Sequence, residues 1–501
     1  MLFRPDRRDF NLIGYYAGKV IYGVGLVMLV PAAIALVLGE YNDVAGFTLA
    51  AALAVAVGRA CELFLYTREP LSTSHGLAAV ALSWLLAPLF AGLPLLLSGH
   101  FASLLDAYFE AMSGFATIGL TLVNDVDHMS RSANLWRHLM QFVGGQGIVV
   151  VVLTIFASAG GRVGHLYTGE GRAEKILPNV VRTARFIWRV SFVYFMIGTA
   201  ALWASLVHAG LHPATALYHA ANLFMSAFGT GGYAPMSTSV AFYRSPVVEI
   251  VLAPIMAAGA FSFALHYQLW MGRRGELARN IETRTIAAST LLMFAVMAVG
   301  LGRTGTFVDL GPLLRHSFFQ LISAHTTTGL STLPGRLFVT DWGVLAPAVL
   351  VTAMALGGMA GSTAGGIKAI RIGLILKGLM RDIRKVLLPE DAIVIEKYHS
   401  TTTRILTDEQ VRAAATILLL WLVLYLGGGL IGLFYGYDLQ VALFESTSAA
   451  SSAGLSVGLV RPDLEWPLKV VYIAEMVIGR LEFIAVFALL GYLVAIVRGR
   501  V

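Results

Sequence analysis

The stretch FEAMSGFATIGLT (109–121) is followed by three related strings, NLFMSAFGTGGYA (222–234), FQLISAHTTTGLS (319–331) and FESTSAASSAGLS (444–456). Each string has a serine six residues before a shared glycine, and a threonine or serine two residues before it. The glycines are Gly119, Gly232, Gly329 and Gly454, and the serines at position −6 are Ser113, Ser226, Ser323 and Ser448. Small residues recur in ordinary membrane-helix interfaces, so one copy alone would indicate only packing. Four copies in one chain indicate a repeated structural unit.

The composition is that of a protein dissolved in lipid. Of the 501 residues, 57% are hydrophobic and only 13% are charged, against about 25% charged in a typical soluble domain. The formal net charge is +7, but the basic residues are spread over short linkers rather than gathered into one patch. This distribution is typical of membrane proteins and argues against nucleic acid as a partner. The single cysteine, Cys61, excludes a disulfide framework or a cysteine-based metal cluster.

Apolar segments of two lengths occur along the chain. The longer ones have the length of spanning helices, for which about 20 residues suffice. They fall at 12–38, 44–66, 76–97, 138–160, 187–209, 246–271, 286–302, 341–380, 411–435 and 467–497. Shorter ones, near 101–116, 213–228, 312–325 and 439–450, each lead into one copy of the repeated string. They are too short to span and are predicted to be re-entrant pore helices.

The linkers between these segments predict an orientation. Basic residues concentrate in 1–11, 161–189, 271–285 and 371–412, and the tail adds Arg498 and Arg500. These linkers are therefore predicted to be cytoplasmic. All four pore helices then lie on the outer side, and both termini face the cytoplasm. Ten spanning helices satisfy this arrangement.

The repeated string has the residue types of a cation filter. A dehydrated cation needs oxygens in place of its hydration shell, and backbone carbonyls supply them in K⁺ filters. Glycine allows the positive φ angles that turn successive carbonyls toward one axis. The neighbouring hydroxyl can add an oxygen or bond an amide. The predicted K⁺ filter residues are Thr117, Ile118, Gly119, Thr230, Gly231, Gly232, Thr327, Thr328, Gly329, Ser452, Ala453 and Gly454.

The unit helix–pore helix–filter–helix, present four times in one chain, resembles the Trk/Ktr/HKT superfamily of K⁺ transporters. Two additional N-terminal helices make it most similar to the TrkH branch. The motifs GGMAGSTAGGIK (357–368) and GRLE (479–482) support the resemblance. It implies an all-α membrane protein with two extra transmembrane helices before four pseudo-symmetric helix–pore-loop–helix repeats. The expected units are 1–70 for the two helices, and 71–165, 186–272, 285–385 and 408–498 for the repeats.

The resemblance also bears on selectivity. In that superfamily a glycine in all four loops goes with K⁺ preference, and a serine in the first loop goes with Na⁺ permeability. This sequence has all four glycines. Ile118 occupies a site often held by threonine, and the fourth copy reads Ser-Ser-Ala-Gly. The K⁺/Na⁺ ratio therefore stays open at this point.

The run 357–368 lies within a long apolar stretch. It is not a phosphate-binding loop, because Ile367 separates Gly366 from Lys368 and no Ser or Thr follows the lysine. One alternative is a close-packed small-residue helix interface. We favour a broken helix whose loop lies beneath the filter as a gate, a role that the resemblance also implies. The predicted gate residues are Gly357, Gly358, Gly361, Ser362, Thr363, Gly365 and Gly366.

Arg480 lies about 14 residues into the last apolar segment, near the middle of the membrane. An arginine at that depth is costly and faces a cavity or a partner. Glu475 and Glu482 are the nearest candidate partners in sequence. The resemblance instead places Arg480 in the permeation path below the filter, as part of the gate.

Polar residues within the pore helices are predicted to support the filter. Glu110, Gln320 and Glu445 hold equivalent places in three copies, whereas the second copy has Asn222 and Leu223 there. They could supply a negative field or anchor the pore helices, and we favour the anchor. The predicted supporting residues are Glu110, Ser113, Ser226, Gln320, Ser323, Glu445 and Ser448.

The resemblance implies partners as well. It suggests a homodimer in a bacterial-type plasma membrane, the inner membrane, that docks a cytosolic TrkA-like nucleotide-binding regulatory ring. The basic loops 161–189, 271–285 and 371–404 are its expected contact region. K⁺ is the expected bound and transported ion, with no covalent cofactor.

Three other functions compete with this interpretation. One is a Na⁺-permeable or ion-coupled K⁺ symporter on the same scaffold. A membrane enzyme would need clustered catalytic residues at one membrane face, which the sequence does not show, so no enzyme is predicted. A non-conducting receptor or scaffold would leave the fourfold repeat without a role.

Overall fold

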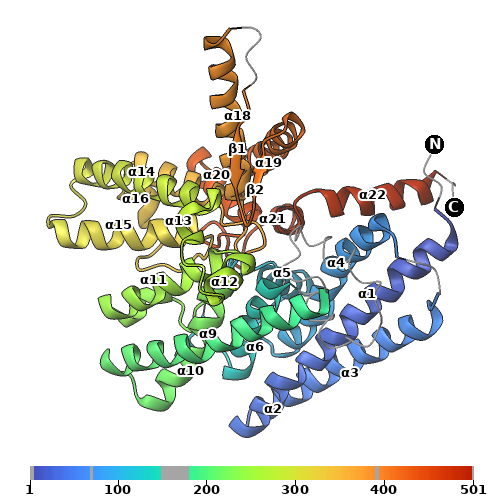
Figure 1. The fold of residues 1–501 in the computed structure, drawn as a ribbon. Coiled ribbons are helices and arrows are strands. Elements are labelled where there is room, and N and C mark those ends of the chain that lie inside the picture. Colours follow the sequence, from blue (N-terminus) through green and yellow to red (C-terminus); the bar gives the residue numbers. More distant parts are fainter. Residues whose placement is uncertain (1–4, 68–70, 124, 148–179, 390–393, 499–501) are drawn as a thin grey trace.

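The computed structural model describes the chain except residues 1–4, 68–70, 124, 148–179, 390–393 and 499–501. The first half of the described chain is helical throughout (Figure 1). Its elements are α1 (Arg7–Val27), α2 (Leu29–Leu38), α3 (Tyr41–Phe64), α4 (Thr73–Leu97), α5 (Leu104–Phe115), α6 (Arg131–Gln146), α9 (Val180–His208), α10 (Pro213–Gly229), the short 3-10 helix η1 (Ser239–Tyr243), α11 (Pro246–Ala260) and α12 (Phe263–Trp270).

The second half adds two strands to the helices. Its elements are α13 (Glu276–Arg279), α14 (Ile281–Thr304), α15 (Leu310–His325), α16 (Leu337–Thr340), α17 (Leu345–Ala355), α18 (Ala369–Leu387), β1 (Lys397–His399), β2 (Thr403–Ile405), α19 (Asp408–Phe434), α20 (Leu439–Ser451), α21 (Trp466–Leu481) and α22 (Ile484–Val497). The four predicted pore helices are therefore α5, α10, α15 and α20.

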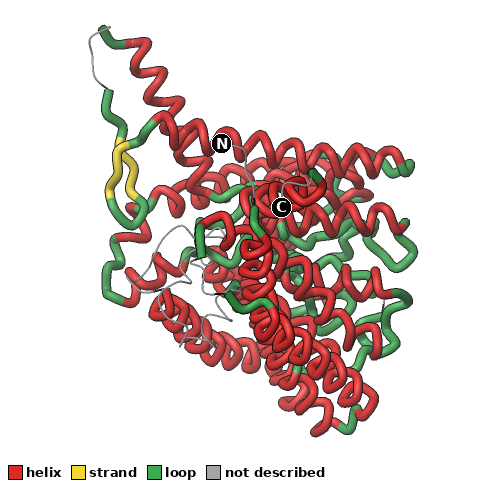
Figure 2. Tube along the Cα trace, turned by 90° about the vertical axis from the view of Figure 1, so that its right-hand side faces the viewer, coloured by secondary structure: helices red, strands yellow, loops and turns green. Residues whose placement is uncertain are grey.

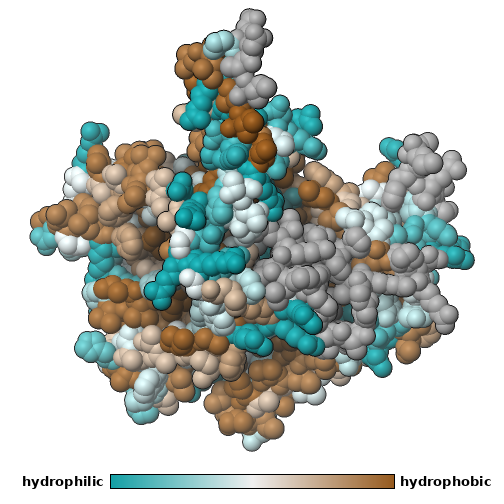
Figure 3. All heavy atoms as spheres, in the orientation of Figure 1, coloured by the Kyte–Doolittle hydropathy of each residue, from teal (hydrophilic) through white to brown (hydrophobic). Residues whose placement is uncertain are grey.

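Several helices have the length and apolar character needed to cross a membrane. Within the described residues there are six, or up to eight if each of two bent pairs counts as one span. Their outward side chains are apolar, as at Val37 and Phe434, which are 85% and 86% exposed. Hydrophobic surface covers much of the face seen in Figure 3. Such exposure suits lipid, because apolar side chains cost nothing against acyl chains.

Three of the apolar stretches are broken rather than continuous. The stretch 246–271 bends by 105° between α11 and α12, where Ser262 caps α12 by accepting a hydrogen bond from the Leu265 amide at 3.1 Å. The stretch 467–497 bends by 114° between α21 and α22, where Glu482 and Phe483 have positive φ angles. The sequence analysis took both as single helices, which is wrong. The predicted break inside 341–380 is present, between α17 and α18.

A β-hairpin follows α18 in the linker that the sequence analysis noted only for its basic charge. Strands β1 and β2 are antiparallel, with Tyr398 opposite Arg404. Figure 2 shows the hairpin beside a helix that projects from the helical body. Glu396 joins the two elements, since its carboxylate accepts from Lys377 at 2.5 Å and from Arg384 at 2.9 Å. The hydrogen bond from Lys377 lowers the pKa of Glu396, which keeps this link ionised.

The four pore helices lie in the interior of the protein. The serine at position −6 of each copy is fully buried. The four helices pack against neighbouring helices, with α5 against α4 and α6, α10 against α9, α15 against α14 and α17, and α20 against α19 and α21. Irregular backbone at membrane depth is tolerated only when protein or a water-filled path surrounds it. The packing therefore provides the setting that the loops after these helices require.

Candidate functional site

The three residues that end at the shared glycine of each repeated string adopt the same backbone conformation. We call these segments the ring loops, 117–119, 230–232, 327–329 and 452–454. The glycine has a positive φ in every copy, between +75° and +94°. The first residue of each loop also has a positive φ, between +51° and +57°, and it is Thr117, Thr230, Thr327 or Ser452. The sequence predicted the first feature and missed the second, because threonine rarely adopts this conformation.

This alternation has a direct effect on the carbonyl groups. The middle residue of each loop, for example Ile118, keeps a negative φ between two left-handed neighbours. When positive and negative φ angles alternate along a segment, successive carbonyl groups point to the same side. In an ordinary β-strand they point to alternate sides. Left-handed threonine costs on the order of 1–3 kcal/mol and persists only where the surroundings hold it.

A hydrogen bond common to all four copies joins each loop to its own pore helix. The amide of the middle residue donates to the backbone carbonyl of the serine at −6, at 2.8 Å in three copies and 3.0 Å in the fourth. The serine side chains differ from copy to copy. Ser113 Oγ accepts from the Gly119 amide at 3.1 Å, and Ser323 Oγ donates to the Leu330 carbonyl at 2.6 Å. Ser226 Oγ and Ser448 Oγ are buried without a hydrogen-bond partner, so their side chains do not give the predicted support.

The four loops touch one another in a closed circle. A Cβ built on Gly119 would lie closer than 3.0 Å to Gly231 of the second loop, a separation that real Cβ atoms essentially never show. The same holds for Gly232 against the third loop, Gly329 against the fourth and Gly454 against Ile118 of the first. In each case the obstructing atom is a backbone carbonyl oxygen of the middle residue. The loops therefore form a ring in which the glycine of each copy lies against the middle carbonyl of the next copy, and only glycine fits there.

A cavity of about 290 Å³ opens at the glycine end of the ring. Its lining includes the glycine of every copy, Gly119, Gly232, Gly329 and Gly454. The lining also includes Arg137 and Tyr233. The ring thus has an open vestibule on one side, which we call the glycine-side vestibule.

Three of the predicted supporting side chains, those of Glu110, Gln320 and Glu445, face the chain just beyond the first, third and fourth ring loops. Glu110 accepts hydrogen bonds from the Thr121 hydroxyl at 2.9 Å and the Leu122 amide at 3.1 Å. Glu445 accepts from the Ser456 hydroxyl at 2.6 Å and the Val457 amide at 2.9 Å. Gln320 donates to the hydroxyls beyond the third loop. These bonds match an anchoring role rather than a field aimed into the vestibule, whose lining includes none of the three.

The segment 357–368 lies against the opposite end of the ring. Thr363 Oγ1 donates to the carbonyls of Phe228 at 3.0 Å and Gly259 at 2.8 Å, and it accepts from Thr230 Oγ1 at 3.2 Å. The Gly365 amide donates to Thr327 Oγ1 at 2.8 Å.

Glycines allow segment 357–368 to pack closely against the ring loops. A Cβ on Gly365 would come closer than 3.0 Å to Ser451 and Ser452 of the fourth copy, and one on Gly358 would do the same with Ala260. Gly357 lies equally close to Gly365 and Gly366, so the segment folds back on itself. Gly361 has a φ of +71°, and Ser362 donates to the Met359 carbonyl at 2.7 Å. The sequence thus predicted a segment that the structure brings against three of the four loops.

Arg480 contacts the remaining loop. Its Nη1 donates to Thr117 Oγ1 at 3.1 Å and to the Thr363 carbonyl at 2.8 Å, and its Nη2 donates to the Gly144 carbonyl at 2.7 Å. The two carboxylates proposed from sequence as its partners have other bonds. Glu482 is bonded to Arg371, and Glu475 accepts from Ser446 at 2.6 Å. Segment 357–368 and Arg480 together contact the first residue of all four ring loops.

Comparison with known proteins agrees with this architecture. Residues 46–491 match the TrkH family, described as "Cation transport protein". This chain belongs to the TrkH family. The predicted all-α membrane fold and the superfamily named from the repeated motif are confirmed. The chain is a multi-pass membrane protein and a transporter rather than an enzyme.

Relatives of this TrkH-family chain match it from end to end. It is 29% identical to an uncharacterized cation transporter, MJ1485, of Methanocaldococcus jannaschii, covering 98% of this chain and 97% of the relative. It is 28% identical to the Trk system potassium uptake protein TrkH of Halomonas elongata, covering 94% and 96%. The crystal structure of the potassium transporter TrkH from Vibrio parahaemolyticus superposes with a TM-score of 0.80 at 23% identity, covering 96% and 98%. That likeness shows the fold.

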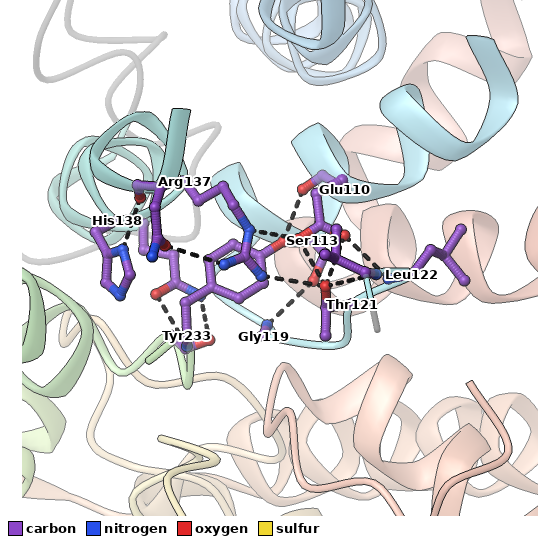
Figure 4. Close-up of polar contacts among 12 residues, drawn as sticks. Glu110, Ser113, Gly119, Thr121, Leu122, Arg137, His138 and Tyr233 are labelled. Carbon is purple, nitrogen blue, oxygen red and sulfur yellow. Dashed lines mark hydrogen bonds and ion pairs between the residues drawn. The ribbon is translucent and has the colours of Figure 1, made fainter. Parts of the chain in front are cut away.

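Arg137, which was not predicted from the sequence, joins the first two loops of this TrkH-family chain. Its Nε donates to Glu110 Oε1 at 2.8 Å, and its Nη2 donates to Thr121 Oγ1 at 3.1 Å (Figure 4). The guanidinium lies 4.0 Å from the centre of the Tyr233 ring, and the Tyr233 hydroxyl donates to the Glu110 carbonyl at 2.8 Å. Arg137 is 1% exposed, but nothing in the sequence marks it as buried, because its partners come from distant segments.

A second missed residue, Gln141, anchors the second loop, whose pore helix lacks the acidic anchor. Its Nε2 donates to the Gly231 carbonyl, and its Oε1 accepts from the Tyr233 amide at 3.3 Å. Helix α6 of the first repeat therefore anchors the second loop through Gln141, whereas Glu110 and Glu445 anchor the loops of their own repeats.

Within the described residues there is no group of three or more His, Cys, Asp or Glu that could hold a metal ion. Two buried histidines instead form hydrogen bonds with hydroxyl groups, His219 with the Tyr243 hydroxyl at 2.8 Å and His325 with Ser289 Oγ at 2.7 Å.

Proposed function

We propose that this protein moves K⁺ across the membrane through the ring of four loops, which acts as a selectivity filter. The observation that carries the proposal is the closed contact of the four glycines with carbonyl groups of the neighbouring loops. Such carbonyls can replace the water around a dehydrated cation. Relatives over nearly the whole chain are named as potassium uptake proteins, which supports K⁺ as the substrate.

The filter proper is the set of residues predicted from sequence. The middle residues Ile118, Gly231, Thr328 and Ala453 offer carbonyls, and the glycines that follow them allow the close approach. The hydroxyls of Thr117, Thr230, Thr327 and Ser452 lie at the far end of the ring, where K⁺ would leave the filter. Glu110, Gln320 and Glu445 hold the loops from behind.

Gating is assigned to segment 357–366 and Arg480. The segment meets the end of three loops and Arg480 meets the fourth, so this end of the path is obstructed by protein. The fixed positive charge would also lower cation occupancy at that end. Opening therefore requires the segment to leave its place against Thr230 and Thr327.

Orientation and partners follow from the charge distribution. The linkers rich in Lys and Arg would face the cytoplasm, which places the glycine-side vestibule outside and both termini inside. A homodimer in a bacterial inner membrane and a cytosolic TrkA-like nucleotide-binding ring are proposed from the family resemblance. Among the expected contact regions, 271–285 and the projecting α18 with its hairpin are described. Most of 161–189 lies outside the described residues.

Flux measurements on purified protein in liposomes test the proposal. With K⁺ on one side and Na⁺ on the other, the reversal potential should follow the K⁺ gradient. A reversal potential set equally by Na⁺ would support the rival, a Na⁺-permeable symporter. A shift in that potential with a proton gradient would indicate coupled transport. The absence of any cation current, in protein that also fails to restore growth of a K⁺-uptake-deficient strain at low K⁺, would contradict it.

A further inference from the structure

A second cavity, of about 450 Å³, lies between α19, α21 and α22. Its walls are aliphatic and aromatic, including Leu424, Ile478, Phe483 and Phe487. None of the residues that line it belongs to the ring loops or to segment 357–368. Its volume falls in the range of small-molecule sites, roughly 300–1,000 Å³. We call it the α19–α22 pocket.

One ionisable side chain, that of Glu475, lines this otherwise apolar pocket. Glu475 is 2% exposed, and its Oε1 accepts a hydrogen bond from Ser446 Oγ at 2.6 Å. Its Oε2 is buried and has no hydrogen-bond partner. A Cβ on the adjacent Gly428 would collide with the carboxylate, so the glycine makes room for this acid. A buried carboxylate oxygen without a partner is costly unless something binds it.

The position of the pocket along α21 indicates that a ligand would reach it through the membrane, so the ligand must be lipophilic. Glu475 is nine residues after Trp466, the first residue of α21, which corresponds to roughly 14 Å along the helix. Among the residues that line the pocket, Val423 and Phe487 are 69% and 53% exposed, so the pocket opens to the surface that faces lipid. No lysine or arginine is among the described residues that line it.

We propose that the α19–α22 pocket binds a lipophilic amine, with its ammonium group on Glu475 and its hydrocarbon part along the apolar wall. An ammonium group fills the unmade hydrogen bond and also supplies the positive charge that the lining lacks. Hydrogen bonds between charged groups are roughly twice as strong as neutral ones, so an amine is favoured over an alcohol of the same shape. Because Ser446 belongs to α20, a molecule held on Glu475 would contact the pore helix of the fourth repeat through that side chain.

Photolabelling in bilayers tests the site. The purified protein is reconstituted in vesicles and illuminated with dodecylamine that carries a diazirine, and labelled peptides are mapped by mass spectrometry. Labelling should concentrate on α19, α21 and α22, with dodecanol carrying the same diazirine labelling at least about tenfold less. The substitution Glu475→Gln should lower labelling by the amine by a similar factor.

Two glycine substitutions provide a matched pair for the cavity itself. Gly427 lines the pocket, and a Cβ there would meet no atom within 4 Å, so Gly427→Leu should fill the pocket and abolish labelling. Gly302 on α14 is also exposed with no atom within 4 Å, so Gly302→Leu is the control and should label like the parent. This pair decides the question even if Glu475→Gln fails to fold.

Three results would overturn the proposal. Equal labelling by the amine and the alcohol would remove the role of the ammonium group. Unchanged labelling in Gly427→Leu would show that the amine binds elsewhere. Cross-links that join two copies of the chain across α19 and α22 would show that a second copy covers the pocket. Labelling is read without any flux measurement, so its outcome is separate from that of the proposed transport function.

Discussion

Arg480 Nη1 donates a hydrogen bond to Oγ1 of Thr117 at 3.1 Å, although the two residues stand 363 positions apart in the chain. Arg480 precedes the break between α21 and α22 by two residues, and Thr117 opens the first ring loop. The same guanidinium donates to the Thr363 carbonyl. One side chain of the fourth repeat thus links the first loop to the segment that lies beneath the ring.

Replacing Arg480 by glutamine is expected to raise the K⁺ flux. Removing a unit charge near a cation path changes the energy of a cation there by about 1–4 kcal/mol, depending on local polarity. Initial uptake into vesicles should therefore rise by about fivefold or more. Arg480→Lys keeps the charge and should remain close to the parent. Equal flux in Arg480→Gln and the parent, with both folded, would show that this charge is not a barrier.

Displacing segment 357–366 should also raise the flux. In Gly365→Val the new side chain meets Ser451 and Ser452, so the segment cannot keep its place against the ring. We expect a several-fold higher K⁺ flux with an unchanged K⁺/Na⁺ ratio. Gly361→Ala is the matched control, because its φ of +71° costs roughly 1–2 kcal/mol but no atom lies within 4 Å of the new Cβ. A Gly365→Val variant that loses selectivity instead would place this glycine in the filter rather than the gate.

Much of the ring was predictable from the sequence, because the residues that form each loop lie close together in the chain. A serine, a hydroxyl residue and a glycine at fixed spacing define the pore helix, the turn and the close approach, and all three lie within one short string. The left-handed Thr117 was not predictable, since nothing in that string overrides the usual preference of threonine. That conformation is held by contacts from other repeats, such as Arg480.

The features missed are those imposed by distant partners. Arg137 has a role only through its contacts with Glu110 and with Tyr233, which belongs to another repeat. The break at Glu482 and Phe483 places two non-glycine residues in the left-handed region, and Arg371 of α18 bonds Glu482 there. The pattern of apolar residues indicates neither the contacts of Arg137 nor this break. A stretch of apolar residues long enough to span has the same hydrophobicity whether the helix is straight or bent.

The close approach between ring loops gives a third prediction. In Gly454→Ala the added methyl group would collide with Ile118 of the first loop, so the ring must open and K⁺ selectivity should be lost. Gly458→Ala is the control, because Gly458 has a similar positive φ of +94° and no neighbour within 4 Å. Bi-ionic reversal potentials measure both variants. If both shift equally, backbone strain and not the close contact is responsible.

The buried pair of Arg137 and Glu110 gives the last prediction. The two side chains are 1% and 0% exposed, and removing one partner leaves the other charge uncompensated. Breaking such a pair costs about 3–5 kcal/mol, so Arg137→Met should lower the unfolding midpoint markedly. Replacing both, as in Arg137→Met with Glu110→Gln, should recover most of that loss, because a buried pair is often no better than neutral groups.

A double-mutant cycle in nanodiscs separates the pair from its surroundings. The exposed pair of Arg461 and Asp463 serves as the control, and its cycle should give at most about 1 kcal/mol. Flux read on the same variants should show loss of K⁺ preference in Arg137→Met, because Thr121 and Tyr233 lose the side chain that ties the first loop to the second. Single effects that simply add up would mean that Arg137 and Glu110 act independently, and the predicted coupling through this pair would then be wrong.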